Sequence, residues 1–240
     1  MTERICIVLP TYNEAQNIGK LLLAISQVTK AETLVVDDSS PDGTASIVKE
    51  ISARNPAVHL LTRPCKVGLG PAYAEGLTWA IDQGFDRIIQ MDCDFSHDPN
   101  YINKLIEKSS LYDLVVGSKY VQGGGVIGLP LSRMLLSRYG NLYIRTILKI
   151  RDQRFSIRDT TSGYMCWRRE LLSQIDFKRL QCFGYGFLIE LKWLAVQLGA
   201  RINEIPIEFR DRTKGQSKFS PSIAFEAIRL PLRVHELVRS

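Results

Sequence analysis

Two aspartates, Asp92 and Asp94, carry the clearest chemical signal, because they close an apolar segment and only one residue separates them. In an extended chain, side chains two residues apart point to the same side. Two close carboxylates repel each other unless a cation lies between them, and hard oxygen ligands suit Mg²⁺ or Mn²⁺, which also bind diphosphates. The pair predicts a divalent-metal site. The alternative is two solvated aspartates that cap the following turn.

Residues 92–99 hold two weaker candidate ligands. Ser96 is a poorer oxygen donor, directly or through water. His97 is a lone loop histidine, and such residues are more often hydrogen-bonded or at the surface than bound to metal. The metal prediction therefore rests on the two aspartates.

A second carboxylate pair, Asp37 and Asp38, ends another apolar segment and precedes the turn SPDG. Proline fixes φ and glycine permits positive φ, so Asp42 and Gly43 are expected to shape this turn. A carboxylate at the strand end can accept hydrogen bonds from a ribose or a base. Asp38, with Asp37 beside it, is therefore predicted to bind a nucleotide.

The segment KVGLG at 66–70 resembles the first half of the dinucleotide-binding fingerprint. The third glycine is missing, because position 73 is Tyr, and the segment follows the third predicted strand rather than the first. The sequence also lacks G-x-x-x-x-G-K-[ST]. A Rossmann dehydrogenase and a P-loop enzyme are both disfavoured.

Basic side chains that could bind a second anion recur late in the chain: Lys119, Arg133, Arg138, Arg212, Lys214 and Lys218. Any one of them alone is more typical of a solvated surface charge. The segment DRTKGQSK at 211–218 is more specific, because its glycine gives flexibility and three cations with Ser217 could close over a diphosphate.

These residues need a framework, and the first 120 residues alternate short Ile/Val-rich runs with amphipathic stretches. We expect strands at 5–9, 33–37, 58–62, 87–91 and 114–117, and helices at 15–26, 44–54, 70–83 and 99–109. This alternation predicts an α/β fold with a mostly parallel open sheet and helices on both faces. Ligands of such sheets bind at the carboxyl ends of the strands, where the unusual loops lie.

The second half is less regular. We expect a glycine-rich loop at 123–128, a basic amphipathic segment at 129–150, a helix around 185–198 and a strand near 201–209. The tail at 221–239 is amphipathic and basic, which fits either a membrane-surface helix or, more simply, a helix packed on the core. No linker divides the chain, so 1–240 is expected to form one domain.

Composition limits the cellular compartment and the kinds of binding partner that we expect. The five cysteines are scattered without zinc-ligand spacing, which favours a reducing cytosol and no disulfide framework. Arginines interrupt the longest apolar stretch and no signal peptide is recognisable, so we expect neither secretion nor a membrane span. A net charge of +6 suits a diphosphate or a phospholipid surface, and no nucleic-acid-binding motif is present.

Six segments together carry a family resemblance: PTYNE, VVDDSSPDG, KVGLGPAY, DCDFSHDP, SGYMCWRR and DRTKGQSK, in this order. The chain resembles family 2 glycosyltransferases of GT-A fold, and within them dolichol-phosphate mannose synthases and their polyprenol-phosphate relatives. The match runs from Ile5 to about Phe219. It implies transfer of mannose, with inversion, from GDP-mannose to a polyprenyl (dolichyl) phosphate, assisted by Mg²⁺ or Mn²⁺.

The resemblance also assigns roles to residues. It implies a nucleotide-sugar-binding half at 1–120, an acceptor-binding half at 121–219 and an amphipathic C-terminal helix at 220–240. Asp94 and Arg212 would be catalytic, and Asp92 and Asp94 would bind the metal. The donor would contact Pro10, Tyr12, Glu14, Asp37, Asp38, Lys66, Gly68, Asp92 and Lys218, and the acceptor phosphate would contact Lys119, Arg133 and Ser137.

Two positions depart from the pattern of some relatives. Ser96 stands where some carry glutamine, and Lys119 where some carry arginine, which would weaken a bidentate grip on the acceptor. Many relatives end in membrane-spanning helices, whereas this chain is similar to the soluble catalytic-subunit type. The resemblance therefore implies a cytoplasmic protein, peripheral on the cytosolic face of a membrane, that reaches its lipid directly or through a small membrane-anchoring partner subunit.

Other readings remain. The donor could be UDP-glucose, or the acceptor a hydroxyl group, in which case Asp159 would be the candidate base. A phosphate acceptor is already ionised and needs none. The chain could instead be a non-catalytic nucleotide-sugar-binding subunit, although both candidate metal ligands are intact. A nucleotidyltransferase, which also uses paired carboxylates, fits the late basic loop and PTYNE less well.

Overall fold

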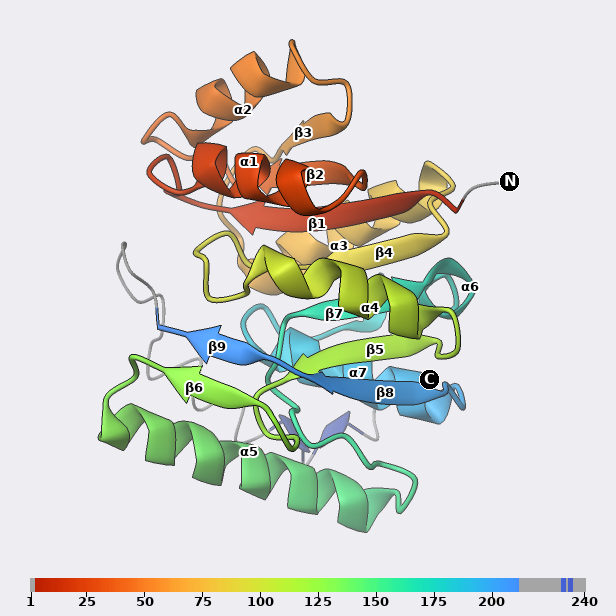
Figure 1. Ribbon diagram of the computed structural model, residues 1–240. Helices are drawn as coiled ribbons and strands as arrows, with labels where there is room; N and C mark the ends of the chain where they lie inside the picture. The colour runs from red at the N-terminus through yellow and green to blue at the C-terminus, as the bar shows by residue number, and fades with distance from the viewer. Residues whose placement is uncertain (1–2, 212–229, 232, 235–240) are drawn as a thin grey trace.

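The computed structural model describes residues 3–211, 230–231 and 233–234. Their framework is one seven-stranded sheet with the strand order β3-β2-β1-β4-β7-β5-β8 (Figure 1). Every neighbouring pair is parallel except those made by β7, which runs antiparallel to both β4 and β5. The strands are β1 (Ile5–Thr11), β2 (Glu32–Asp37), β3 (Val58–Thr62), β4 (Arg87–Gln90), β5 (Leu114–Ser118), β7 (Met165–Arg168) and β8 (Ile202–Pro206).

Helices cover both faces of the sheet, because successive strand residues alternate between two apolar clusters. On β1, Cys6 and Val8 join one cluster, whereas Ile7 and Leu9 join the other. The first cluster includes residues of α3 (Leu69–Asp82), α5 (Leu131–Arg151), α6 (Arg169–Leu172) and α7 (Gly186–Gln197), and the second includes residues of α1 (Ile18–Val28), α2 (Thr44–Ser52) and α4 (Ile102–Ser109). The predicted α/β fold with a mostly parallel sheet is confirmed.

The elements expected in the first half are present with small shifts at their ends. Helix α1 begins at Ile18 rather than at residue 15, because the backbone N–H groups of Asn17 and Ile18 both bond to the carbonyl of Glu14 in a turn. The predicted start at Asp98 is confirmed: its side chain accepts a 2.9 Å bond from the N–H of Asn100 and caps the 3₁₀ turn η1 (Pro99–Tyr101), which leads into α4.

The second half differs more. The expected glycine-rich loop at 123–128 contains a strand, β6 (Gly125–Ile127), which pairs with β9 (Glu208–Arg210) in a separate two-stranded sheet. The strand expected at 201–209 is divided into β8 and β9, with the break at Ile207. Another short 3₁₀ turn, η2 (Phe177–Arg179), precedes α7.

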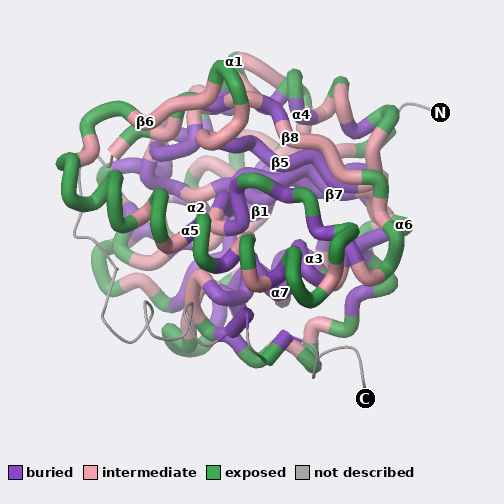
Figure 2. The backbone as a smooth tube through the Cα atoms, turned by 90° about the horizontal axis from the view of Figure 1, so that it is seen from below, coloured by how far each residue is buried: buried purple, intermediate pink, exposed green. Residues whose placement is uncertain are grey.

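Burial separates the sheet from α5. Figure 2 shows the strands of the sheet as buried, whereas α5 carries exposed residues along much of its length. Asn141, Ile144 and Leu148 are its buried residues. In the described part of the tail, Leu230 and Val234 are buried and belong to the core, as a core-packed helix would require. Among the described residues, no helix is long and apolar enough to span a membrane.

Candidate functional site

The candidate donor site lies where the strand order reverses. β1 lies between β2 and β4, so the loops that follow these strands meet at one edge of the sheet. Such switch points are where open α/β sheets bind their ligands. Of the predicted donor residues, Pro10 ends up within β1 and pairs with Val36 of β2.

Asp37 organises the loop after β2. It is fully buried and its oxygens accept three hydrogen bonds, from the hydroxyl of Thr11 at 3.0 Å, the N–H of Ser40 at 2.9 Å and the hydroxyl of Ser40 at 2.6 Å. These bonds tie the loop to β1. Its predicted contact with a nucleotide stays a prediction, because its bonds within the protein already account for its position.

Asp38 has a partner that the sequence reading missed. The guanidinium of Arg63 donates to Asp38 Oδ1 at 2.6 Å and to Glu75 at 2.9 Å, and both Asp38 and Arg63 are less than 7% exposed. Burial raises the pKa of Asp38, and Arg63 opposes part of that shift. Arg63 directly follows β3, so its position at a strand end was the available signal.

Polar contacts join the loops after β1 and β2. Glu14 is buried, its carboxylate accepts a 2.8 Å bond from the amide of Asn17, and its N–H donates to the hydroxyl of Thr44 at 3.0 Å. Asp42 accepts from both the hydroxyl and the N–H of Thr44, which confirms its expected part in the turn. The loops therefore form one preorganised surface.

The loop 66–70 faces the loop after β1. The ammonium of Lys66 lies 4.2 Å from the ring centre of Tyr12. Gly68 has φ of 146°, and a Cβ there would lie 2.5 Å from the carbonyl oxygen of Phe183, so only glycine fits. The N–H of Gly70 donates to the same carbonyl at 3.0 Å. The segment around Phe183 thus packs against the loop at 66–70 and holds its backbone in place.

Asp92 and Asp94 follow β4 and are fixed by neighbours. Asp92 Oδ1 accepts a 2.9 Å bond from the hydroxyl of Tyr73, and Asp94 Oδ1 accepts a 3.0 Å bond from the N–H of Ser96. Tyr73 was the residue that broke the glycine fingerprint in the sequence. Here it orients the first candidate metal ligand, and its hydroxyl stays protonated because burial, with Asp92 second, raises its pKa well above its ordinary value.

His97 is held by contacts other than a metal. Its Nδ1 accepts from the N–H of Asp92 at 3.1 Å, and its ring stacks on Tyr164 and meets Phe209 edge-on. Burial lowers its pKa, although the Asp92 and Asp94 carboxylates oppose this. The ring is therefore neutral at pH 7 and buttresses the loop.

Asp92 and Asp94 are the candidate ligands for a metal. No group of three or more His, Cys, Asp or Glu that could hold a metal ion occurs in the described part of the chain. Mg²⁺ sites in enzymes commonly use one or two carboxylates and take the remaining oxygens from water and substrate phosphates. Asp92 and Asp94 fit that kind of site, with Tyr73 behind Asp92 as a supporting hydrogen-bond donor.

The candidate acceptor residues gather around the end of β5. Lys119 Nζ lies 3.2 Å from Asp159 Oδ2 and 3.4 Å from the hydroxyl of Thr161. The hydroxyls of Tyr120 and Ser137 lie 2.7 Å apart, which links β5 to α5. Burial of Asp159 would raise its pKa, but Lys119 and Lys192 outweigh this and lower it. Asp159 is thus an ionised partner of Lys119.

The remaining predicted residues divide between the surface and the part of the chain that is not described. Arg133 is on α5, one turn before Ser137, with a side chain 46% exposed and its guanidinium 3.8 Å from Asp211. Arg212 and Lys218 lie outside the described residues, so their predicted roles remain predictions.

The fold and this arrangement of loops define a glycosyltransferase of the GT-A class. The chain belongs to glycosyl transferase family 2, whose sequence model matches residues 6–176. It is 38% identical to an undecaprenyl-phosphate mannosyltransferase of Micrococcus luteus over 94% of this chain and 91% of that one. It is 39% identical to a polyprenol monophosphomannose synthase of Mycolicibacterium smegmatis over 95% of this chain and 85% of that one.

The fold is also that of a solved structure, a mannosyltransferase of Pyrobaculum calidifontis in complex with GDP-Man and Mn²⁺. The TM-score is 0.57 at 16% identity, over 99% of this chain and 72% of that one. At this identity the likeness concerns the fold alone.

Proposed function

We propose that this enzyme transfers mannose from GDP-mannose to the phosphate of a polyprenyl (dolichyl) lipid. The observation that carries the proposal is its 38% and 39% identity, over nearly the whole chain, to two proteins named as mannosyltransferases of such phosphates. The arrangement of the site also supports the proposal. Fixed carboxylates lie after β1, β2 and β4, on the donor side, and a basic group lies after β5, on the acceptor side.

The donor occupies the switch point. A structure of this fold has been solved with GDP-Man and Mn²⁺, so the fold can hold a guanosine donor together with a divalent metal. Asp92 and Asp94 would hold the metal, whose chemistry when bound is to neutralise the diphosphate. Asp38, held by Arg63, would contact the nucleoside, and Lys66, which lies over the ring of Tyr12, would contact the donor beside it.

The reaction needs no protein base. An oxygen of the acceptor phosphate forms a bond to the anomeric carbon as the bond from that carbon to the donor diphosphate breaks, with inversion and release of GDP. The acceptor phosphate is already anionic at neutral pH, so no proton has to be removed. Lys119 and Ser137 orient the attacking phosphate. Asp159, 3.2 Å from the Lys119 ammonium, holds that ammonium in a fixed place.

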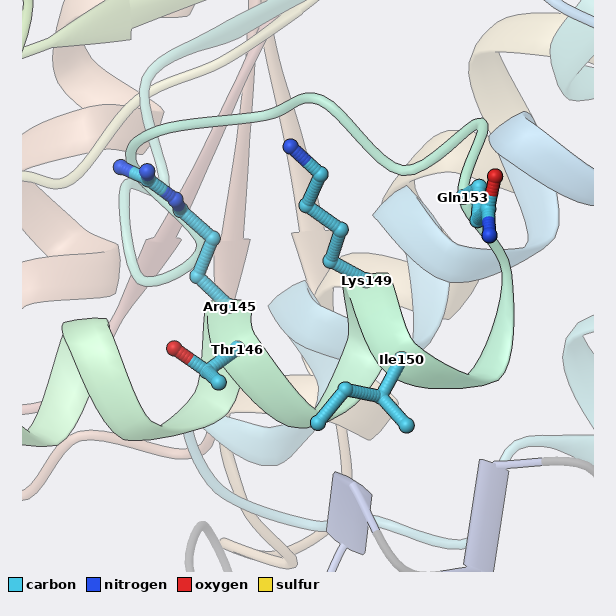
Figure 3. A pocket seen from close by; sticks show the side chains of 5 residues that line it. All are labelled: Arg145, Thr146, Lys149, Ile150 and Gln153. Carbon is cyan, nitrogen blue, oxygen red and sulfur yellow. The ribbon is translucent and has the colours of Figure 1, made fainter.

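Helix α5 provides the surface for the lipid. The helix exposes eight large apolar side chains along its length: Leu131, Met134, Leu135, Leu136, Tyr139, Leu142, Tyr143 and Ile150. Near its C-terminal end Arg145 and Lys149 project next to each other and, with Thr146, Ile150 and Gln153, line a cavity of about 560 Å³ (Figure 3). Apolar groups flanked by cations suit an anionic membrane surface. We therefore place the enzyme peripherally on the cytosolic face, with or without an anchoring subunit.

The test is transfer by the purified chain. Radiolabelled GDP-mannose, a short polyprenyl phosphate and Mn²⁺ or Mg²⁺ should give label in the organic phase, and EDTA should abolish it. Asp94→Asn should lower the rate by about 10²–10³-fold, the usual loss for a group that stabilises developing charge. Asp98→Asn is the matched control, since Asp98 lies in the same loop and its carboxylate bonds Asn100 at the start of η1.

Two outcomes would redirect the proposal. Label with UDP-glucose but not with GDP-mannose would keep the lipid-phosphate acceptor and change the donor. No label with either donor, in the presence of membranes, would reject lipid-phosphate transfer and favour a hydroxyl acceptor or a binding subunit.

A further inference from the structure

Helix α7 carries two charged residues that no part of the mechanism above uses. Glu190 and Lys192 are both fully buried. Charged side chains are seldom buried unless they are paired and hydrogen-bonded, because desolvation is costly. Two residues apart on a helix means about 200° of rotation, so the two side chains point to nearly opposite sides of α7.

Lys192 is directed at the segment that follows residue 159. Its ammonium donates to the carbonyl of Ser162 at 2.6 Å and to that of Thr160 at 3.2 Å, with a third contact at 3.4 Å to the carbonyl of Leu188 in its own helix. An apolar side chain would pack equally well in a protein core. The ammonium is explained by the two loop carbonyls that it bonds.

The loop held by Lys192 is the one that holds Lys119. Asp159 Oδ1 accepts from the N–H groups of Thr161 and Ser162, and the carboxylate binds the Lys119 ammonium. The hydroxyl and N–H of Thr160 also donate to Asn141 of α5. A continuous set of bonds therefore runs from Lys192 through the loop and Asp159 to Lys119.

The charged groups around Lys192 come from three elements. The pKa of Lys192 is lowered to about 7, chiefly by burial; Asp159 opposes this shift, Lys119 adds to it, and Glu204 of β8 opposes it. Glu204 accepts from the N–H groups of Arg158 and Asp159, so it belongs to the same network. Lys119 first, and Lys192 after it, lower the pKa of Asp159.

We infer that Lys192 is a positioning residue for the acceptor phosphate, which fixes the 159–163 loop and, through Asp159, the ammonium of Lys119. The inference rests on the proposed function, because it takes Lys119 as the group that meets the acceptor. Glu190 lies on the opposite side of α7. Its carboxylate accepts from the N–H groups of Gln181 and Cys182, next to the segment around Phe183 that contacts the loop at 66–70.

The experiment compares three variants in the full chain. Lys192→Met keeps the length of the side chain and removes its charge and donors, Lys192→Gln keeps a donor, and Glu190→Gln removes a buried charge on the same helix without touching the 159–163 loop. The KM for a short polyprenyl phosphate and the KM for GDP-mannose are measured for each. A merely structural role would change both constants together.

We expect Lys192→Met to raise the acceptor KM about tenfold and the donor KM less than twofold, with partial rescue in Lys192→Gln. Glu190→Gln should not raise the acceptor KM more than the donor KM. Equal changes in both constants for Lys192→Met, or no change in either, would overturn the inference. If Lys192→Met fails to fold, the same comparison is made with Lys192→Gln.

A second measurement separates this inference from the proposed function. Wild-type transfer to the lipid phosphate tests the function by itself. Backbone amide exchange at residues 160–163, measured without substrate, tests the loop: it should be faster in both Lys192 variants and unchanged in Glu190→Gln. Unchanged exchange in the Lys192 variants would reject the positioning role even if wild-type transfer is observed.

Discussion

The donor half and the acceptor half hold their polar side chains differently. Around the donor site, Asp37, Asp38 and Asp94 are each at most 4% exposed, and each is bonded to a neighbouring loop or side chain. Around the acceptor site, Arg133 is half exposed on α5, beside a row of exposed apolar side chains. Lys119 and Ser137 are exceptions, since Asp159 holds the ammonium of Lys119 and the hydroxyl of Tyr120 lies 2.7 Å from that of Ser137.

The difference matches the two substrates. A nucleotide sugar arrives from water and gains specificity from groups that are already fixed, because less ordering remains to be done on binding. A lipid phosphate is presented at a surface, where apolar contact matters more than fixed polar geometry. Four predictions test whether the halves differ in this way.

The largest expected effect is on stability in the donor half. Arg63→Met should lower the free energy of unfolding by about 3–5 kcal/mol, because Asp38 would remain buried without its cation. Arg133→Met, in the acceptor half, should change it by less than about 0.5 kcal/mol. Chemical denaturation of both variants measures the difference, and equal stabilities would remove the contrast.

The second prediction compares alanine substitutions at two glycines, one in each half. Gly68→Ala should raise the KM for the donor about tenfold or more, because its Cβ would meet the Phe183 carbonyl at 2.5 Å and displace the loop. Gly140 is in α5, and apart from its chain neighbours and the backbone of its own helix turn, no atom lies within 4 Å of a Cβ built there. Gly140→Ala should instead stabilise the protein by up to about 1 kcal/mol, through helix propensity. Donor kinetics and thermal unfolding of both variants check this.

A smaller effect is expected at the outer side of α5. Replacing both Leu136 and Tyr139, 62% and 65% exposed, by Gln should weaken binding to vesicles with anionic lipid about tenfold. The matched control replaces Leu23 and Leu111, which are 61% and 62% exposed on other parts of the surface, in the same way. Vesicle co-sedimentation compares the two double variants, and equal losses would mean that α5 has no special role.

The fourth prediction concerns pH. Lys192 has a pKa of about 7 in the folded protein and an ordinary value of 10.5 when unfolded. Between these values the unfolded chain binds more protons, so this residue makes the free energy of unfolding rise with pH, by at most about 1.4 kcal/mol per unit. Lys192→Met lacks this contribution. The free energy of unfolding of the wild type minus that of Lys192→Met should therefore increase from pH 7 to pH 9 in denaturation experiments. A constant difference would contradict this prediction.

The first half of the chain was largely predictable because its pattern is local. The strand at 58–62 agrees with β3 residue for residue, and the others shift by one or two residues at their ends. β6 could not be foreseen, since Gly125 has little strand propensity and the strand exists because it pairs with β9. β7 likewise depends on two distant partners.

The site divides in the same way. The strand-end aspartates were visible from sequence because position and residue type coincide. The partners that fix them were not, because pairs such as Arg63 with Asp38, Tyr73 with Asp92 and Lys192 with the loop carbonyls join residues far apart in the sequence. In the sequence, Tyr73 stands out only because it occupies the third-glycine position of the dinucleotide-binding fingerprint.

Strand β7 has a consequence for the order in which the molecule can form. It is made after α5, yet it fills the gap between β4 and β5, which were made before α5. A nascent chain that ends before β7 leaves the facing edges of β4 and β5 open, and such edges are prone to pair with other chains. Because these contacts are long-range, we expect slow, cooperative folding in which neither half is an autonomous unit. Fragments cut between β5 and α5 should reassemble only when co-expressed.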